Sequence, residues 1–240
     1  MISRFHFDGS LPASGEVALP DALAHHALRV LRLHDGAPLV LFDGQGGEVE
    51  ARLVVRGKHG FARLGERREV ERESPLEVVL VQALATGDKM DWVVQKAVEL
   101  GASAIQPVQA ERSVLRLAGE RADKRQAHWQ QVAVAACEQC GRNRIPALRP
   151  LQPLLNWLAA HRHGLNYVLA PGGGAGFGAE PLPQGPVHLL VGPEGGWSEA
   201  ELAAFDAAAC RRVRLGPRVL RTETAGLAAL AALQARWGDY

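Results

Sequence analysis

Two glycine-rich segments near the end of the chain carry the residue types expected of a site that binds a small molecule. Residues 192–198 contain three glycines and follow an apolar run, and residues 215–225 contain Gly216 and a group of polar side chains. Because glycine lacks a Cβ atom, a ligand can approach the backbone closely at such positions. The first backbone N–H groups of a following helix have no partner within that helix and can bind polar ligand atoms.

Each glycine-rich segment is expected to join a strand to a helix at one edge of a parallel sheet. Ser198 and Glu201 have the spacing of a capping box, and Thr222 is expected to cap the second helix. Loops at the carboxyl ends of neighbouring parallel strands form the usual ligand crevice of an α/β sheet. Either loop alone could be an ordinary tight turn, so the prediction of a ligand site depends on the pair.

A polar segment, residues 138–146, is the second candidate for chemistry. Gly141 is expected to end a long helix, which places Glu138 in the last turn, where the helix dipole disfavours a carboxylate. Such a violation indicates either a functional site or a structural ion pair, with Arg142 or Arg144 as the partner. Both interpretations stay open on the sequence alone.

A basic group in the first part of the chain could contact a polyanion. His25, Arg29 and Arg32 are spaced four and three residues apart within a helix expected over residues 20–33, so they would share one face. The functional interpretation is a stripe that contacts nucleic-acid phosphates. The alternative is an ordinary solvated helix face.

Cysteine and histidine pairs do not predict a metal site. Cys137 and Cys140 have the spacing of a zinc or redox pair, but a structural zinc site needs four ligands and the chain has no second pair. Both cysteines lie on the expected apolar stripe of a helix, which favours packing. His25 and His26 are adjacent and would point in different directions on a helix.

The elements that position these residues divide the chain near Ser74. Residues 1–74 read as short strands and turns with one helix, whereas residues 75–240 alternate strands with helices. A charged run, residues 66–73, is typical of a connector or of a solvated strand or helix face. The alternation predicts an α/β fold, with a mostly parallel sheet covered by helices.

Buried-strand runs and helical periodicity locate the elements of the second part. We expect strands over residues 76–84, 104–108, 167–170, 187–191 and 213–215, and helices over residues 90–100, 121–140, 198–209 and 223–237.

Composition bounds the remaining possibilities. The chain has 240 residues, a formal net charge of +1 and three cysteines. A chain of this length can bury a core without disulfides, and few cysteines suit a reducing cytoplasm. We find no signal segment and no apolar run long enough to span a bilayer, so we expect a cytoplasmic protein without a membrane. A charge near zero means that any nucleic-acid binding must use local patches.

Together these motifs closely resemble the RsmE family. The strongest match is the pair of loops, Gly192, Pro193, Glu194, Gly195, Gly196, Trp197 and Ser198 with Leu215, Gly216, Arg218, Leu220, Arg221, Glu223, Thr224 and Ala225. The resemblance also covers His25, His26, Arg29, Val30, Leu31, Arg32, Phe42, Asp43 and Gly44, most of residues 89–101, and Glu138, Gln139, Gly141 and Arg142. The family usually has serine where this chain has Cys140, which supports a packing role for the cysteine pair.

The resemblance implies a bacterial enzyme that methylates N3 of a uridine in 16S ribosomal RNA, uridine 1498, with S-adenosylmethionine as the methyl donor. Residues 1–74 would form a small, β-rich, PUA-like RNA-binding barrel. Residues 75–240 would form a SPOUT methyltransferase domain whose C-terminal part is threaded into a trefoil knot. The substrate would be 16S rRNA or the small ribosomal subunit. The family also implies a homodimer, and the alanine-rich face of the last helix would allow close helix approach.

The resemblance further assigns S-adenosylmethionine to three loops. The expected cofactor-binding residues are Leu169, Ala170 and Pro171, then Gly192, Pro193, Glu194, Gly195 and Gly196, then Leu215, Gly216, Leu220, Arg221, Thr222 and Ala225. Backbone groups would recognise the adenine edge, with Leu215 and Leu220 packing on the ring. His25, Arg29 and Arg32 are the expected RNA-binding residues.

Methylation at uracil N3 requires loss of the N3 proton, by a base or with an arginine that stabilises the anion. The candidates are Arg142, Glu138 and Arg221, in falling order, and no metal is needed. One alternative is a SPOUT enzyme acting on another rRNA or tRNA nucleotide. The other is a non-catalytic RNA-binding module of ribosome assembly.

Overall fold

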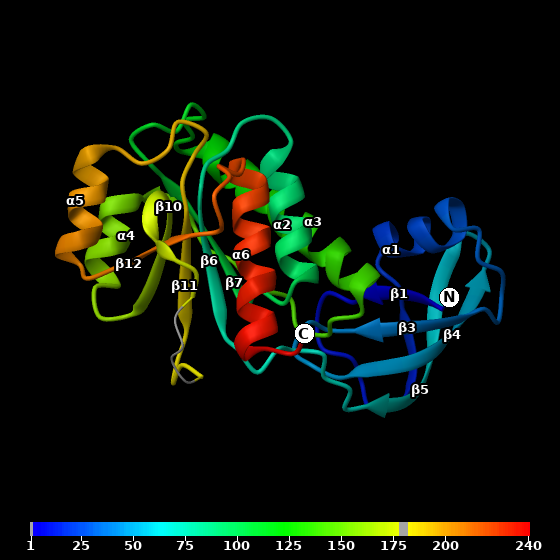
Figure 1. The fold of residues 1–240 in the computed structure, drawn as a ribbon. Helices are drawn as coiled ribbons and strands as arrows, with labels where there is room; N and C mark the ends of the chain where they lie inside the picture. The colour runs from blue at the N-terminus through cyan, green and yellow to red at the C-terminus, as the bar shows by residue number, and fades with distance from the viewer. Residues whose placement is uncertain (1, 178–181) are drawn as a thin grey trace. The chain divides into compact units, whose positions relative to one another are not determined.

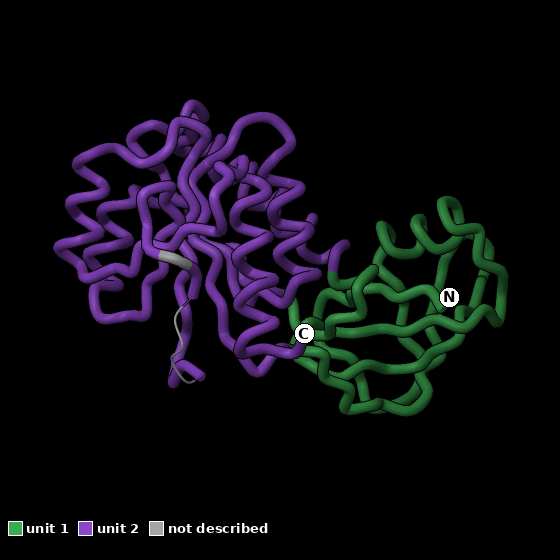
Figure 2. Tube along the Cα trace, in the orientation of Figure 1, with its two compact units in different colours: residues 1–73, 137–145 green, residues 74–136, 146–240 purple. Residues whose placement is uncertain are grey.

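A computed structural model describes residues 2–177 and 182–240 of the chain. The chain divides into two compact units (Figure 2). Unit 1 comprises Met1–Glu73 and Cys137–Ile145, and unit 2 comprises Ser74–Ala136 and Pro146–Tyr240. The chain first passes from unit 1 to unit 2 between Glu73 and Ser74, next to the expected domain boundary. Residues 137–145, in contrast, belong with unit 1 rather than with the second part of the chain, because their side chains bind residues of unit 1 that are distant in sequence.

Unit 1 contains a five-stranded sheet with the strand order β1-β3-β4-β5-β2 (Figure 1). The strands are β1 (Ser3–His6), β2 (Gly15–Ala18), β3 (Pro38–Phe42), β4 (Glu48–Arg56) and β5 (His59–Arg68). β1 pairs with β3 in parallel, and the other pairs are antiparallel. Val49, Ala51 and Leu53 of β4 all face the core, since alternate residues of a strand share one face.

The helix of unit 1 is shorter and less regular than predicted. α1 (Asp21–His25) continues into a π-helical segment, η1 (His26–Val30), and Leu31 N donates to His26 O at 2.9 Å. The backbone of Arg32 then has a φ of 53°, in the left-handed region. The prediction of one helix over residues 20–33 is therefore wrong at its C-terminal end.

Unit 2 contains a seven-stranded sheet whose strands all run parallel, in the order β12-β10-β11-β6-β7-β8, with β9 also pairing with β7. The strands are β6 (Val78–Ala83), β7 (Ala104–Gln109), β8 (Ala147–Leu148), β9 (Gln152–Pro153), β10 (Leu165–Ala175), β11 (Val187–Val191) and β12 (Arg211–Arg214). The helices are α2 (Lys89–Glu99), α3 (Glu120–Cys140), whose last residues from Cys137 onward belong to unit 1, α4 (Leu154–Ala160), α5 (Glu199–Ala207) and α6 (Thr222–Trp237). The predicted α/β class is thus confirmed.

Helices cover both faces of this sheet, with α4 and α5 on one face and α2 and α6 on the other (Figure 1). Every residue of β6 is buried, as expected of a strand that is covered on both sides. α6 approaches β11 closely at Gly226, where an added Cβ would lie 3.2 Å from Val191 Cγ2. Within the described residues, no helix has the length and apolar character needed to cross a membrane. The trefoil knot stays a prediction.

Candidate functional site

The carboxyl ends of three neighbouring strands of unit 2, β10, β11 and β12, surround a pocket of about 480 Å³. This volume is within the range of about 300–1,000 Å³ that is typical of small-molecule sites. The pocket is lined by Leu169, Ala170, Pro171, Gly192, Pro193, Glu194, Gly196, Leu215, Gly216, Leu220, Arg221, Thr222 and Ala225. The fold therefore brings together all but one of the residues expected to bind a cofactor.

The exception is Gly195, which does not line the pocket. A Cβ atom added at Gly195 would lie 3.0 Å from Arg112 Cβ and 3.1 Å from the Arg112 carbonyl oxygen. The absence of a side chain at Gly195 thus allows close packing against a neighbouring loop. The next residue, Gly196, has a φ of 68° and does line the pocket.

A hydrogen-bonded link joins two of the pocket loops. The Thr222 hydroxyl donates to Gly192 O at 2.5 Å and accepts from Gln82 Nε2 at 3.0 Å. Arg221, not Thr222, is the N-cap residue of α6, and no side chain caps it, so the predicted cap is wrong. The Thr222 side chain instead ties the start of α6 to the turn that follows β11.

Gln82 lies beneath this link and was not among the predicted site residues. It occupies the carboxyl end of β6 and is 0% exposed, and its Nε2 also donates to Ala83 O at 2.9 Å. Among the described residues, nothing forms a hydrogen bond to Gln82 Oε1. The sequence did carry a signal for this residue, a polar side chain within an otherwise apolar run. A buried amide is costly unless it has hydrogen-bond partners, so such a side chain indicates a specific buried contact.

Glu194 forms a charged cluster at the wall of the pocket. Its Oε1 accepts from Thr86 N at 3.0 Å, from the Thr86 hydroxyl at 2.8 Å and from Lys89 Nζ at 2.8 Å. Burial opposes ionisation of the carboxyl, but the hydrogen bonds from Lys89 and Thr86 outweigh it and lower the pKa of Glu194 to about 2. Glu194 is therefore an anion at neutral pH, held by the loop between β6 and α2.

Trp197 connects the other pair of loops. Its indole Nε1 donates to Leu169 O at 2.9 Å, and its ring packs edge-on against Phe205. A Cβ added at Gly192 would lie 3.1 Å from this ring, so the ring packs closely against the backbone there. The capping box of Ser198 and Glu201 that begins α5 is confirmed.

The predicted residues Glu138 and Arg142 lie in unit 1, whereas the pocket lies in unit 2. Glu138 Oε1 accepts from His6 N at 2.9 Å, a backbone partner that the sequence did not indicate, and its pairing with Arg142 or Arg144 stays a prediction. Arg142 is only 4% exposed, and its Nε and Nη2 bind the Glu73 carboxylate, the former at 3.0 Å. Arg144 pairs with Glu71 at 2.8 Å.

Asn143 completes the attachment of this segment to unit 1. The side chain is fully buried, and its Nδ2 donates to Val70 O at 2.7 Å while its Oδ1 accepts from Arg4 at 2.6 Å. Arg4 also pairs with Glu48 at 2.6 Å; burial opposes ionisation of Glu48, but hydrogen bonds from Arg4 and Arg72 outweigh it and lower its pKa. This geometry favours a structural role for Arg142, while its catalytic role stays a prediction.

The predicted RNA-contacting residues are all exposed but do not form one helical stripe. His25 belongs to α1 and Arg29 to η1, while Arg32 lies beyond the helix with its positive φ. Each side chain can still reach a ligand, but the spacing argument from a regular helix does not hold.

The cysteine pair lies at the end of α3. Cys137 is buried, its Sγ donates to Arg144 O at 3.7 Å, and burial raises its pKa to about 12. A thiol in this state is a poor ligand, since metals bind the thiolate. No group of three or more possible metal-binding side chains occurs in the part of the chain that the structure describes.

Comparisons with known proteins agree with this architecture. Residues 72–234 match a family model described as an RNA methyltransferase domain, and residues 19–62 match an RNA methyltransferase PUA domain. The chain is 36% identical to ribosomal RNA small subunit methyltransferase E of Bacillus subtilis, over 87% of this chain and 86% of that protein. It is 30% identical to the protein of the same name from Buchnera aphidicola, over 99% and 98% of the two chains.

Solved structures show the same fold. The structure of ribosomal RNA small subunit methyltransferase E from Neisseria gonorrhoeae bound to S-adenosylmethionine superposes with a TM-score of 0.93 at 41% identity, covering 100% of this chain and 99% of that chain. A structure from Legionella pneumophila that holds the same cofactor gives a TM-score of 0.93 at 36% identity, with 100% of both chains covered. The unit 1 sheet is thus the PUA-like domain, and the chain belongs to the RNA methyltransferase family of the ribosomal RNA small subunit methyltransferase E proteins.

Proposed function

We propose that this protein transfers a methyl group from S-adenosylmethionine to N3 of uridine 1498 in 16S rRNA, with the cofactor in the pocket of unit 2. Membership of the family supports the general activity, S-adenosylmethionine-dependent methylation of small-subunit rRNA, without specifying the target nucleotide or atom. The observation that supports the pocket assignment is the meeting of three loops from distant parts of the sequence around one space of about 480 Å³.

The residues around the pocket fit this cofactor. Gly196 and Gly216, where an added Cβ would meet nothing within 4 Å, allow close approach to the backbone, which recognition of an adenine edge requires. Leu215 and Leu220 supply apolar surface for the ring. When bound, S-adenosylmethionine supplies a methyl group on a positively charged sulfur.

The protein must then promote loss of the proton from uracil N3 and align the base. Of the three predicted catalytic residues, Arg221 is the one that lines the pocket, so we assign it the stabilisation of negative charge on the base. Arg142 and Glu138 are engaged by Glu73 and by the His6 backbone within unit 1. We propose that they shape the RNA-facing unit, and a direct catalytic role for either stays a prediction.

The proposed substrate is 16S rRNA or the small ribosomal subunit, and we propose a cytoplasmic homodimer. One face of α6 supports self-association. Ala228 and Ala235 are exposed and Ala231 and Ala232 are only half-buried, so unit 2 does not cover this face itself. Small side chains of this kind allow two helices to approach closely.

The test is reconstitution. Purified protein, S-adenosylmethionine and small subunits from cells that lack the protein should yield 3-methyluridine in 16S rRNA, measured by nucleoside mass spectrometry. Methylation at another nucleoside would indicate a related methyltransferase with a different target. Absence of both cofactor binding by calorimetry and methyl transfer would indicate a non-catalytic RNA-binding module.

A further inference from the structure

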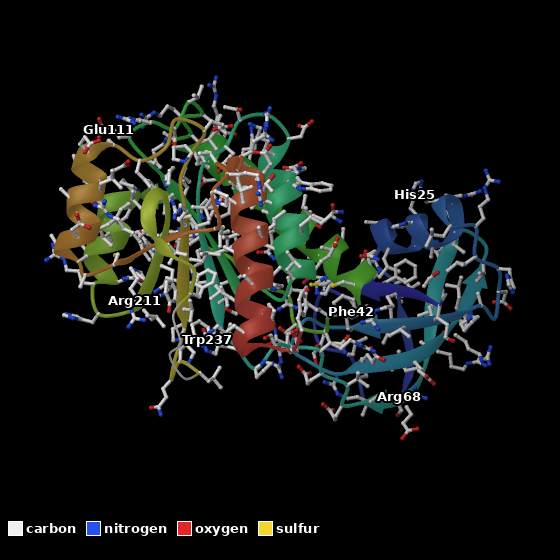
Figure 3. All side chains as sticks on the ribbon, in the orientation of Figure 1. His25, Phe42, Arg68, Glu111, Arg211 and Trp237 are labelled. Atoms are coloured by element: carbon white, nitrogen blue, oxygen red, sulfur yellow. The ribbon has the colours of Figure 1, made fainter. Side chains whose placement is uncertain are left out.

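The loops that follow the strands of the unit 2 sheet carry a group of exposed arginines. Because all strands run parallel, the loops that follow the strands lie at one edge and the loops that precede them lie at the other. Exposed arginines gather after the strands: Arg112 and Arg116 follow β7, Arg214 ends β12, and Arg218 and Arg221 follow it. Exposed arginine also occurs at the opposite edge, where Arg211 begins β12 (Figure 3), so charge alone does not distinguish the edge that follows the strands.

Two exposed valines lie between these arginines in the sequence. Val114 is 73% exposed and Val219 is 81% exposed, the highest values among the large hydrophobic side chains of the described residues. Val114 is flanked by Arg112 and Arg116, and Val219 directly follows Arg218. A single exposed valine is unremarkable, but an exposed valine near exposed arginines on each of two loops indicates a surface with a common ligand.

Both loops adjoin the pocket. Arg214, Arg218 and Val219 are among its lining residues. The loop after β7 reaches the same place, since Arg112 Nη1 donates to Gly195 O at 3.4 Å, and Gly195 is flanked by two residues that line the pocket. Arg212 pairs with Asp206, whereas Arg214 and Arg218 form no ion pair with any carboxylate of residues 2–177 and 182–240.

We propose that Arg112, Val114, Arg116, Arg214, Arg218 and Val219, here called the arginine–valine rim, dock single-stranded RNA around the target nucleotide. This proposal rests on the proposed function and adds a second RNA-contacting surface to that of unit 1. A single strand presents a phosphate and an apolar base face at every nucleotide, which matches arginines interleaved with exposed aliphatic groups. The net charge of +1 means that this attraction is local to the rim.

The test uses two rim residues that do not line the pocket. The double variant Arg112→Gln, Arg116→Gln should bind a single-stranded 16S rRNA fragment containing the target uridine at least tenfold more weakly at low salt. The slope of log affinity against log salt should flatten by about 0.7 for each lost phosphate contact on a single strand, so by about 1.4 for the pair. Arg116→Gln alone, which removes only a hydrogen bond to Glu111 O within its own loop, should leave the affinity for S-adenosylmethionine, measured by calorimetry, unchanged.

Arg162→Gln is the matched control, because Arg162 is an exposed arginine that precedes β10 at the opposite edge of the same sheet. It should leave RNA affinity and salt slope at wild-type values. An unchanged affinity and slope in the double variant would overturn the proposal. If the wild type methylates rRNA and the double variant binds RNA normally, only the proposal of an RNA-docking arginine–valine rim is refuted. If the wild type methylates no rRNA, the proposed function itself fails.

Val219→Asp separates RNA from the other possible occupant of this surface, a second copy of the chain. We expect weaker RNA binding with an unchanged sedimentation coefficient of the free protein. Dissociation of a dimer with unchanged RNA affinity would show that the valines contact another protomer, and would also overturn the proposal.

Discussion

Thr222→Val should weaken cofactor binding although the substitution barely changes the shape of the side chain. The hydroxyl is the donor to Gly192 O and the acceptor for Gln82 Nε2, and Thr222 is buried. Valine leaves the carbonyl and the amide N–H without this partner. The turn after β11 and the start of α6 then lose the hydrogen bond that fixes the distance between them at the pocket.

The magnitude follows from the cost of buried groups that lose a hydrogen bond, about 1–3 kcal/mol for each. If the two groups recover half of this by relaxation, the free energy of unfolding falls by about 2 kcal/mol. For a chain of this size, that corresponds to a decrease of about 4–8 °C in the melting temperature. Misplacement of the two loops should raise the Kd for S-adenosylmethionine about tenfold, or about 1.4 kcal/mol.

Isothermal titration calorimetry and thermal unfolding measure the two effects separately. Thr222→Ser is the control, since it retains the hydroxyl and removes only the methyl group, and it should keep the Kd close to wild type. The reasoning is refuted if Thr222→Val binds the cofactor as tightly as the wild type, or if the serine variant loses as much affinity as the valine variant.

Three further predictions address other parts of the molecule. Burial, with nearby His161 and Arg149, lowers the pKa of His188 from 6.5 to about 4, so the unfolded chain takes up a proton at a higher pH than the folded protein does. The free energy of unfolding should therefore fall by up to about 3 kcal/mol as the pH drops from 6.5 to about 4, and His188→Gln should remove this pH dependence in thermal melts. Arg142→Ala should destabilise the protein by about 1–3 kcal/mol, because the partly buried Glu73 carboxylate loses its partner. Equal loss of activity in Glu73→Ala would favour a structural rather than a catalytic arginine. Arg29→Ala with Arg32→Ala should flatten the salt dependence of RNA binding by about 0.7–0.9 for each lost contact without changing cofactor affinity; an unchanged slope would remove these residues from the RNA surface.

Local signals predicted the parts of the fold in which a residue acts on its neighbours. The capping box at Ser198 and Glu201 uses a side chain and a backbone N–H three residues apart, and it is present as expected. The buried strands were predicted because a strand covered on both faces is continuously apolar. The two glycine-rich loops meet because parallel strands place their carboxyl ends at one edge of the sheet.

Interactions between distant residues could not be predicted in the same way. Glu138 binds the backbone of His6, 132 residues away, and no local rule selects that partner over Arg142 or Arg144. Gly195 and Gly196 are indistinguishable in sequence, yet one packs on Arg112 and the other lines the pocket, which depends on the placement of the loop after β7.

Some missed features did carry a signal. α4 was not predicted, although Leu154, Trp157 and Leu158 have helical spacing and are buried. Gln82 interrupts an apolar strand with an amide, which indicates a buried polar partner. The π-helical η1 followed by the positive φ of Arg32 had no such signal, since its residues are equally compatible with a regular helix.

The most direct test of the central claim is nucleoside analysis of 16S rRNA from cells that lack this protein, complemented either with the wild-type chain or with Thr222→Val. We predict that 3-methyluridine is absent from 16S rRNA of the deletion strain and is restored by the wild-type chain. The Thr222→Val variant should restore it only in part when the concentration of S-adenosylmethionine is low. Full 3-methyluridine in 16S rRNA of the deletion strain would contradict the assignment.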